Sequence, residues 1–184
     1  SRLNKTANQI YLSATEEPEA TWQEGAGGAW KTGRFTTALE KVYDGGTIKL
    51  LNAIVITEKA EITKSVTITS NDASEPCVMT RMPIAQWGNI TINGGNLTLT
   101  NVIYDGNRDW IHGTEDAKKQ SLIKVGDSAS DTEARLTLGT GVVVRDGYKT
   151  GGSGLFAVYG TMTMNNGAVI ENCEVTNNGA GTGG

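Results

Sequence analysis

Residues 96–106 read NLTLTNVIYDG, and related stretches follow as RLTLGTGVVVRDG at residues 135–147 and TMTMNNGAVIEN at residues 161–172. In each stretch an apolar-Thr-apolar triplet precedes a short junction and a second apolar run. Alternation of apolar and polar residues has the period of a β-strand with one face in a core. An internal repeat of such strands indicates a solenoid, because a unit this short buries its apolar face only by stacking on its neighbours.

Each copy follows another short apolar strand, at residues 89–92, 121–125 and 154–159, so one turn of the repeat holds three strands. Leu136 and Met162 are 26 residues apart, whereas Leu97 and Leu136 are 39 apart. The excess lies in residues 107–120 and 126–134, which are charged and weakly periodic, as loops at the corners of a solenoid should be. We therefore expect an all-β fold, a parallel β-helix with three strands per coil.

The segment before the clear repeats contains further strand patterns at residues 47–51, 54–57 and 66–69, which predict at least one additional coil. Ahead of them, TALE at residues 37–40 fits a capping box, and Leu39 and Val42 share a face with Phe35. This pattern predicts a short amphipathic helix of about two turns. Such a helix would cap the first coil, whose apolar end otherwise faces solvent.

The two ends of the chain differ from the repeats in composition. Residues 1–34 contain a cluster of glutamates followed by glycines, and we interpret them as an N-terminal leader or cap segment. Residues 35–184 then form the β-helix. The last residues, NNGAGTGG at 177–184, are typical of a coil corner, so we expect this to be the N-terminal portion of a β-helix that continues in a longer chain.

The run from residue 35 to 69, followed by the Leu-Thr-Leu…Val-Ile-x-Asp-Gly units, resembles the pectin-lyase-like superfamily. Within it, the chain is most similar to repeat-containing bacterial surface proteins, in which a helix and a Gly-Gly-Thr-Ile-x-Leu strand open the solenoid, here residues 44–50. Gly-Gly corners followed by an apolar-Tyr strand also recur in those proteins, and residues 151–159 (GGSGLFAVY) are a diverged version. The resemblance implies a right-handed parallel β-helix and a bacterial, extracellular or cell-surface location. Members of the superfamily include glycan-cleaving enzymes and non-catalytic adhesins, so the fold alone implies no reaction.

Composition and charge argue against several classes of protein. The net charge is −4, and the 16 Lys and Arg residues are scattered, so the basic stripe of a nucleic-acid-binding protein is missing. No apolar run approaches the roughly 18 residues that a membrane span requires, so we expect no membrane insertion. The spacings C-x-x-C and H-x-x-x-H are absent, and His112 is the only histidine.

Asp105 and Asp146 are the leading catalytic candidates, because the repeats align them and in-register stacking would bring them together. Carboxylates about 5 Å apart suit paired-carboxylate glycoside hydrolysis. The alternative, which we favour, is that each side chain caps its corner by bonding nearby backbone N–H groups. A pectate-type lyase would also need a basic residue, and Arg108 and Arg145 are the best placed. Arg145 directly precedes Asp146 on a strand, where the two would point to opposite faces, which argues against a joint site.

Residues 105–116 offer a weak calcium pattern. Asp105, Asn107 and Asp109 alternate, and Asp116 stands where the last ligand of a calcium loop would be. Trp110 occupies the position at which such a loop needs glycine, so we favour a solvated corner loop and expect no cofactor unless calcium binds here.

Four side chains in or beside the larger insertion suggest a sugar-binding platform: Tyr104, Trp110, His112 and Tyr148. Aromatic rings present the flat apolar surface on which a sugar ring stacks. The alternative is that Trp110 only pins the insertion to the side of the solenoid.

These observations predict a non-catalytic, surface-exposed β-helix segment of a larger bacterial protein, acting as an adhesin-like scaffold or binding a glycan or host surface protein. Two alternatives remain open. One is a carbohydrate-active enzyme, a polysaccharide lyase or glycoside hydrolase, that uses an acidic face of the β-helix. The other is an accessory module of a larger multidomain enzyme.

Overall fold

The structure is a computed structural model that describes residues 17–83, 88–115, 119–151 and 154–176, and it is an all-β fold built mainly from parallel sheets. The first sheet contains, in spatial order, β16 (Thr161–Met164), β12 (Arg135–Leu138), β9 (Asn96–Thr100), β6 (Ser65–Ser70), β3 (Gly46–Leu50), β1 (Ala20–Gln23) and β2 (Trp30–Gly33). The second contains β17 (Val169–Glu171), β13 (Val143–Arg145), β10 (Val102–Asp105), β7 (Cys77–Arg81) and β4 (Ile54–Ile56). The third contains β15 (Phe156–Val158), β11 (Ile123–Val125), β8 (Ile90–Ile92) and β5 (Ala60–Ile62).

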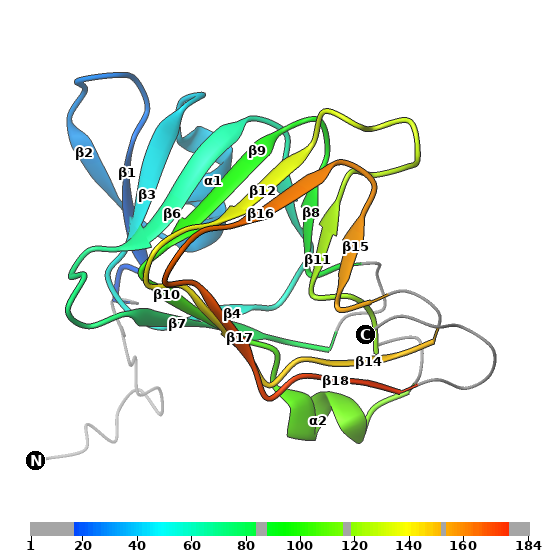
Figure 1. The fold of residues 1–184 in the computed structure, drawn as a ribbon. Coiled ribbons are helices and arrows are strands. Elements are labelled where there is room, and N and C mark those ends of the chain that lie inside the picture. Colours follow the sequence, from blue (N-terminus) through cyan, green and yellow to red (C-terminus); the bar gives the residue numbers. More distant parts are fainter. Residues whose placement is uncertain (1–16, 84–87, 116–118, 152–153, 177–184) are drawn as a thin grey trace, which may run out of the picture.

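From β3 onward the chain visits these three sheets in a fixed order, and each complete visit is called a coil below (Figure 1). Strands of successive coils pair in parallel, for example β3 with β6, β6 with β9 and β9 with β12. The predicted alignment of the repeats is confirmed in the first sheet, where Leu136 lies opposite both Leu97 and Met162. A fourth sheet, which the sequence did not predict, pairs β14 (Tyr148–Thr150) with β18 (Glu174–Thr176).

The core is a set of rows in which one aliphatic side chain per coil stacks on the next. In the first sheet the pairing aligns Ile48 with Ile68, Ile68 with Leu99, and Leu99 with Leu138. All four are buried, as the alternation in the sequence predicts. The intervening threonines, Thr67, Thr98, Thr137 and Thr163, form a second row on the outer face.

Within the predicted leader or cap segment of residues 1–34, the structure describes residues 17–34, which include two strands. β1 and β2 form an antiparallel hairpin, and β1 also pairs antiparallel with β3, so the hairpin covers that edge of the first sheet. Ala20 and Trp22 of β1 are buried in the core. Residues 1–16 lie outside the described part of the chain.

The predicted capping helix is present as α1 (Phe35–Lys41), but the predicted capping box is wrong. The helix begins two residues before Thr37, and Arg34 at the N-cap position makes no side-chain capping bond. Instead, the Glu19 carboxylate, just before β1, accepts a hydrogen bond of 2.7 Å from the backbone N–H of Phe35. Capping by a distant carboxylate leaves no local sequence signature.

The insertion after β10 contains a second helix, α2 (Arg108–His112), in place of the expected irregular loop. Asn107 precedes it in the left-handed backbone conformation. Across the described part of the chain, neither helix has the length and apolar character needed to cross a membrane.

Replacing one residue of the stacked row tests this core. We expect Leu99→Ala to lower the free energy of unfolding by about 2–5 kcal/mol, because it opens a cavity between Ile68 and Leu138. The outward control Thr98→Ala should cost less than about 1 kcal/mol. Urea denaturation followed by circular dichroism measures both, and equal losses would contradict this assignment of the inner face.

Candidate functional site

The predicted site residues gather at one corner of the solenoid, where β10, β13 and β17 end and α2 lies against β14 (Figure 1). A shallow pocket of about 320 Å³ at this corner is lined by Asp105, Asn107, Arg108, Asp109, Asp146 and Asn172. An adjoining hollow of about 400 Å³ is lined by Arg108, Asp109, His112 and Glu174. Of the candidates named from the sequence, these two hollows bring together Asp105, Asn107, Asp109, His112 and Asp146.

Asp105 is held by contacts of the fold. One carboxylate oxygen accepts a hydrogen bond of 2.8 Å from the backbone N–H of Asn107. The other oxygen lies 3.1 Å from both Nε and Nη2 of Arg145, which makes a two-point ion pair across neighbouring coils. The predicted turn-capping role of Asp105 is therefore confirmed, and Arg145 is its main charged partner.

The predicted alignment of Asp105 with Asp146 is wrong by one residue. Asp105 lies opposite Arg145, while Arg145 lies opposite Glu171 of the next coil. The second copy has two more residues than the first between the buried leucine and the aspartate. The corner around residues 139–141 takes up one of them, and the run from Val142 to Asp146 is one residue longer than the run from Val102 to Asp105, so Arg145 lies opposite Asp105. Asp146 instead accepts a hydrogen bond from the side-chain amide of Asn172.

Arg145 and Asp146 lie on the same side, contrary to the expectation that they point to opposite faces. The Nε atom of Arg145 is 3.7 Å from a carboxylate oxygen of Asp146. β13 ends at Arg145, and Asp146 adopts a left-handed conformation with φ of 51°, so strand alternation stops between them. Arg108, which follows β10, reaches two coils ahead, since its guanidinium donates hydrogen bonds of 3.1 Å to the carbonyl and side-chain oxygens of Asn172 after β17.

Glycine recurs after both aspartates because the two corners touch. A Cβ on Gly106 would lie 2.5 Å from the Cα of Gly147 and 2.7 Å from the carbonyl oxygen of Asp146. The recurrence of Asp-Gly in the sequence therefore reflects close packing of neighbouring coils rather than a stacked pair of carboxylates.

The weak calcium candidates do not form a ligand set among the described residues. Asp105 is paired with Arg145, and the side-chain amide of Asn107 donates to the carbonyl of Arg81 at 3.0 Å. Asp109 lies on α2 with its side chain fully exposed. Asp116 lies outside the described residues. In the described ranges no cluster of three or more His, Cys, Asp or Glu residues suits a metal ion.

Only two of the four predicted platform residues are exposed. Trp110 projects from α2 with 53% of its surface accessible, and His112 on the same helix is also exposed. Tyr148 is buried, and its ring packs edge-on against His112 at a centroid distance of 4.9 Å. Tyr104 is a core residue whose hydroxyl donates to the Leu122 carbonyl at 3.2 Å, so its inclusion in the platform was wrong. Tyr104 lies two residues after buried Val102 on the same strand, and this alternation in the sequence already indicated that Tyr104 faces the core.

Two buried basic residues beneath this corner were not singled out from the sequence. Arg81 is fully buried and donates to the Tyr148 carbonyl at 3.2 Å, and buried Lys149 donates to the Thr150 carbonyl at 2.9 Å. Burial lowers the pKa of Lys149, and the positive charge of Arg81 lowers it further. The position of Arg81, two residues after buried Met79 in β7, was a visible sign that it faces inward.

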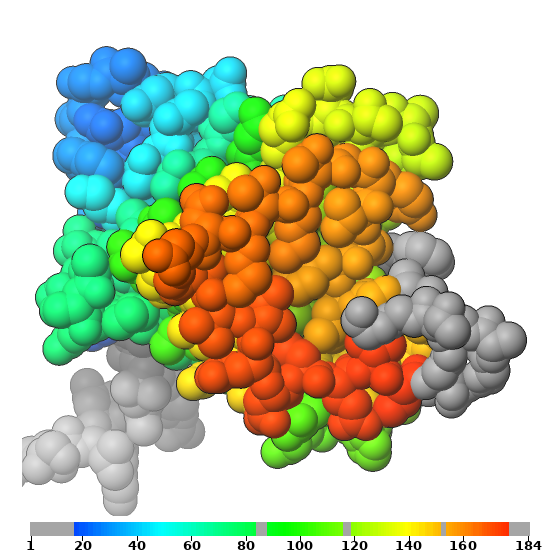
Figure 2. All heavy atoms as spheres, viewed as in Figure 1, coloured from blue at the N-terminus to red at the C-terminus, as the bar shows by residue number. Residues whose placement is uncertain are grey.

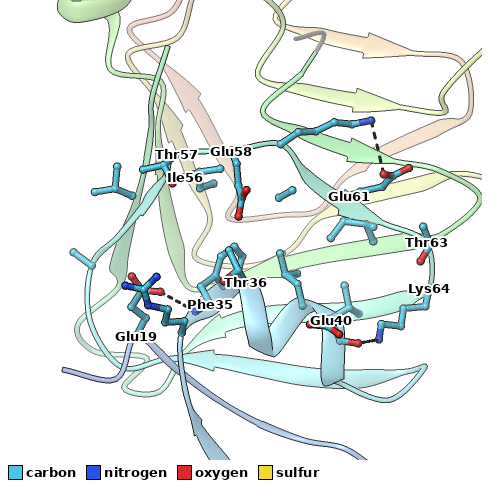
Figure 3. A pocket seen from close by; sticks show the side chains of 18 residues that line it. Glu19, Phe35, Thr36, Glu40, Ile56, Thr57, Glu58, Glu61, Thr63 and Lys64 are labelled. Carbon is cyan, nitrogen blue, oxygen red and sulfur yellow. Dashed lines mark hydrogen bonds and ion pairs between the residues drawn. The ribbon is translucent and has the colours of Figure 1, made fainter. Parts of the chain in front are cut away.

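Another hollow lies at the opposite end of the fold, between α1 and the first coil (Figure 3). It has a volume of about 790 Å³, and residues of β4, β5 and α1 line it. No candidate from the sequence analysis falls in this hollow.

Comparisons with models of protein families, with curated proteins and with solved structures give no match.

The ion pair at the corner can be measured as a coupling energy. Asp105→Ala removes both the turn bond and the ion pair and should cost about 1–2 kcal/mol, whereas Asp105→Asn keeps an acceptor for Asn107 and should cost less. A double-mutant cycle of Asp105→Asn with Arg145→Gln should give a coupling of about 0.5–1 kcal/mol because the pair is partly exposed. This coupling should shrink in about 1 M salt. A coupling of zero at low salt would refute the structural role.

Tyr104 should make the fold sensitive to alkali. Burial raises the pKa of its hydroxyl above the ordinary value, while the charge of Arg81 opposes the shift. Above pH of about 10 the unfolded chain releases this proton and the folded chain keeps it, so stability falls by about 1.4 kcal/mol per pH unit from this group. Tyr104→Phe should flatten the decline seen in denaturant unfolding between pH 9 and 11, whereas the exposed control Tyr159→Phe should not. An unchanged slope in Tyr104→Phe would contradict the burial of the hydroxyl.

Proposed function

We propose that this chain is a right-handed parallel β-helix of the pectin-lyase-like kind, and that it serves as a non-catalytic, surface-exposed scaffold of a larger bacterial protein. The fixed order in which the strands enter three parallel sheets supports the β-helix. The Leu-Thr-Leu and Asp-Gly units and the DGGTIKL segment at residues 44–50 support the resemblance.

The non-catalytic proposal rests on the contacts that the carboxylates of Asp105 and Asp146 make. Asp105 binds the backbone of its own corner and Arg145 of the next coil, and Asp146 binds Asn172 of the coil after that. A general acid or nucleophile must be available to substrate, whereas these carboxylates hold neighbouring corners together. The acidic corner is therefore best explained as a part of the scaffold.

A longer β-helix is supported by the end formed by β16 and β17, whose strands face the viewer in orange and red in Figure 2. Met164, Val169 and Ile170 are 48%, 41% and 38% exposed there, although their counterparts Leu138, Val143 and Val144 in the preceding coil are covered more fully. A further coil of a longer chain would bury these side chains and pair with their strands.

The proposed activity is binding of a glycan or of a host surface protein, with α2 as the contact element. Exposed Trp110 offers a ring for stacking on a sugar. A hollow at the same helix is lined by Arg108, Asp109, His112 and Glu174, which supply hydrogen-bond donors and acceptors for hydroxyl groups. An extracellular location at the bacterial surface is part of this proposal.

A glycan panel tests the binding proposal. We expect the protein to bind at least one uronic-acid or neutral glycan without cleaving it, and Trp110→Ala to weaken binding about two- to tenfold, since aromatic stacking contributes about 0.5–1.5 kcal/mol. Trp30→Ala is the matched control, because Trp30 is 46% exposed and lies on the distant hairpin. Isothermal titration calorimetry measures both, and an equal loss in the two variants would refute a site on α2.

The competing enzymatic function is a glycan lyase or hydrolase that uses the pocket shared by Asp105 and Asp146. The same panel, with and without calcium, is assayed for new reducing ends and unsaturated products. Cleavage that disappears in Asp105→Asn or Asp146→Asn would overturn the non-catalytic proposal.

A further inference from the structure

The corner between β16 and β17 contains an asparagine followed by a glycine at residues 166–167 (Figure 1). Asn166 and Gly167 are both exposed, and Gly167 adopts the left-handed backbone conformation with φ of 85°. The Ala168 N–H donates to the Asn165 carbonyl at 3.1 Å, which closes a tight turn around the pair. Asn166 therefore lies in a surface turn, where water reaches it.

An Asn-Gly pair is the sequence in which the backbone most readily attacks the preceding side chain, because glycine has no Cβ to shield its nitrogen. The attack needs a free glycine N–H, since the nitrogen loses this proton as it bonds to the side-chain carbonyl carbon. Within the described residues the Gly167 N–H has no hydrogen-bond acceptor, and the side chain of Asn166 has no partner. Only the two main-chain carbonyls of the pair are bonded, by Thr140 Oγ1 and the Gly141 N–H, each at 3.3 Å.

The other Asn-Gly pair in the described part of the chain, Asn93-Gly94, is held by hydrogen bonds. The Gly94 N–H donates to the Asp131 carboxylate at 2.9 Å, and the Asn93 side-chain amide donates to the Glu61 carboxylate at 2.9 Å. Glycine N–H groups are also bonded at three Asp-Gly pairs, where the same cyclisation can start: Gly45 to Ser65, Gly106 to Arg145 and Gly147 to Cys173. Across the described ranges, Asn166-Gly167 is thus the one such pair whose glycine nitrogen is free.

The free N–H follows from the position of Gly167 in the stack. Leu138 lies opposite Met164, so Gly141 and Gly167 occupy equivalent places in successive corners. Gly141 donates its N–H to the carbonyl of Gly167 in the next coil. A further coil would accept the Gly167 N–H in the same way, so the free nitrogen is a property of the uncovered end of the stack.

We propose that Asn166 is a site of spontaneous deamidation, which leaves an aspartyl or isoaspartyl residue at this corner. The backbone nitrogen of Gly167 attacks Cγ of Asn166, a C–N bond forms, and the Cγ–Nδ2 bond breaks. The departing amide nitrogen takes the proton from Gly167 and leaves as ammonia. Water then adds to either carbonyl of the resulting succinimide and opens the ring, and no atom is oxidised or reduced. The product has a new negative charge, and the isoaspartyl form adds one carbon to the main chain.

Peptide mapping of the 184-residue chain follows the reaction at mildly alkaline pH in water enriched in heavy oxygen. We expect Asn166 to deamidate about tenfold faster than Asn93, because Asn93 reacts only when Gly94 has lost its hydrogen bond. Cleavage after Glu171 separates Asn166 from Asn178, which lies outside the described residues. In strong denaturant Asn166 and Asn93 should react at equal rates, because each then precedes glycine in an open chain.

The variant Asp131→Ala tests the cause of the difference, because it frees the Gly94 N–H. We expect it to raise the rate at Asn93 about tenfold and to leave the rate at Asn166 unchanged. Asp131→Asn is the matched control, since it keeps an acceptor oxygen and should raise the rate at Asn93 less. Equal rates at Asn93 and Asn166 in the folded chain, or no labelled product at Asn166, would overturn the proposal. An unchanged rate at Asn93 in Asp131→Ala would overturn the role of the free N–H on which it rests.

Discussion

Aliphatic side chains from successive coils stack directly on one another inside the fold, and the parallel strand pairing that aligns them also satisfies the backbone of every inner coil. The row from Ile48 through Ile68 and Leu99 to Leu138 is the clearest case, with one residue per coil and near-complete burial. A single coil cannot bury its own inward-facing side chains, so each coil depends on its neighbours for both burial and backbone hydrogen bonds. This dependence explains why the two ends of the stack are where apolar surface and unpaired strand edges appear.

The same constraint leaves the corners free to vary in length and chemistry. The insertion after β10 carries α2 without disturbing the pairing of β10 with β13. Left-handed residues at the corners, Asn101, Asn107, Asp146 and Asn172, redirect the chain between sheets. Polar side chains at these corners bind across coils, as Asp105 does to Arg145, so much of the charge there stabilises the stack.

The sequence was informative wherever alternation and repetition reflect the stacked rows. It predicted most strands of the three sheets, the alignment of Leu97, Leu136 and Met162, and the presence of a helix before β3, but it missed β5 and β7. It misaligned Asp105 with Asp146, because the second copy has one more residue between the corner and the aspartate, so Arg145 and not Asp146 lies opposite Asp105. The hairpin of β1 and β2, the capping of α1 by Glu19 and the burial of Arg81 depend on contacts between distant segments, which a local pattern does not encode.

The stacked register is tested most directly by solution NMR of the isotope-labelled 184-residue chain. Interstrand contacts between backbone protons report which residues lie opposite each other. We expect contacts that join Leu99 to both Ile68 and Leu138, and Asp105 to Arg145. Contacts that place Asp105 opposite Asp146, or that join neighbouring repeats as antiparallel hairpins, would contradict the stacked register.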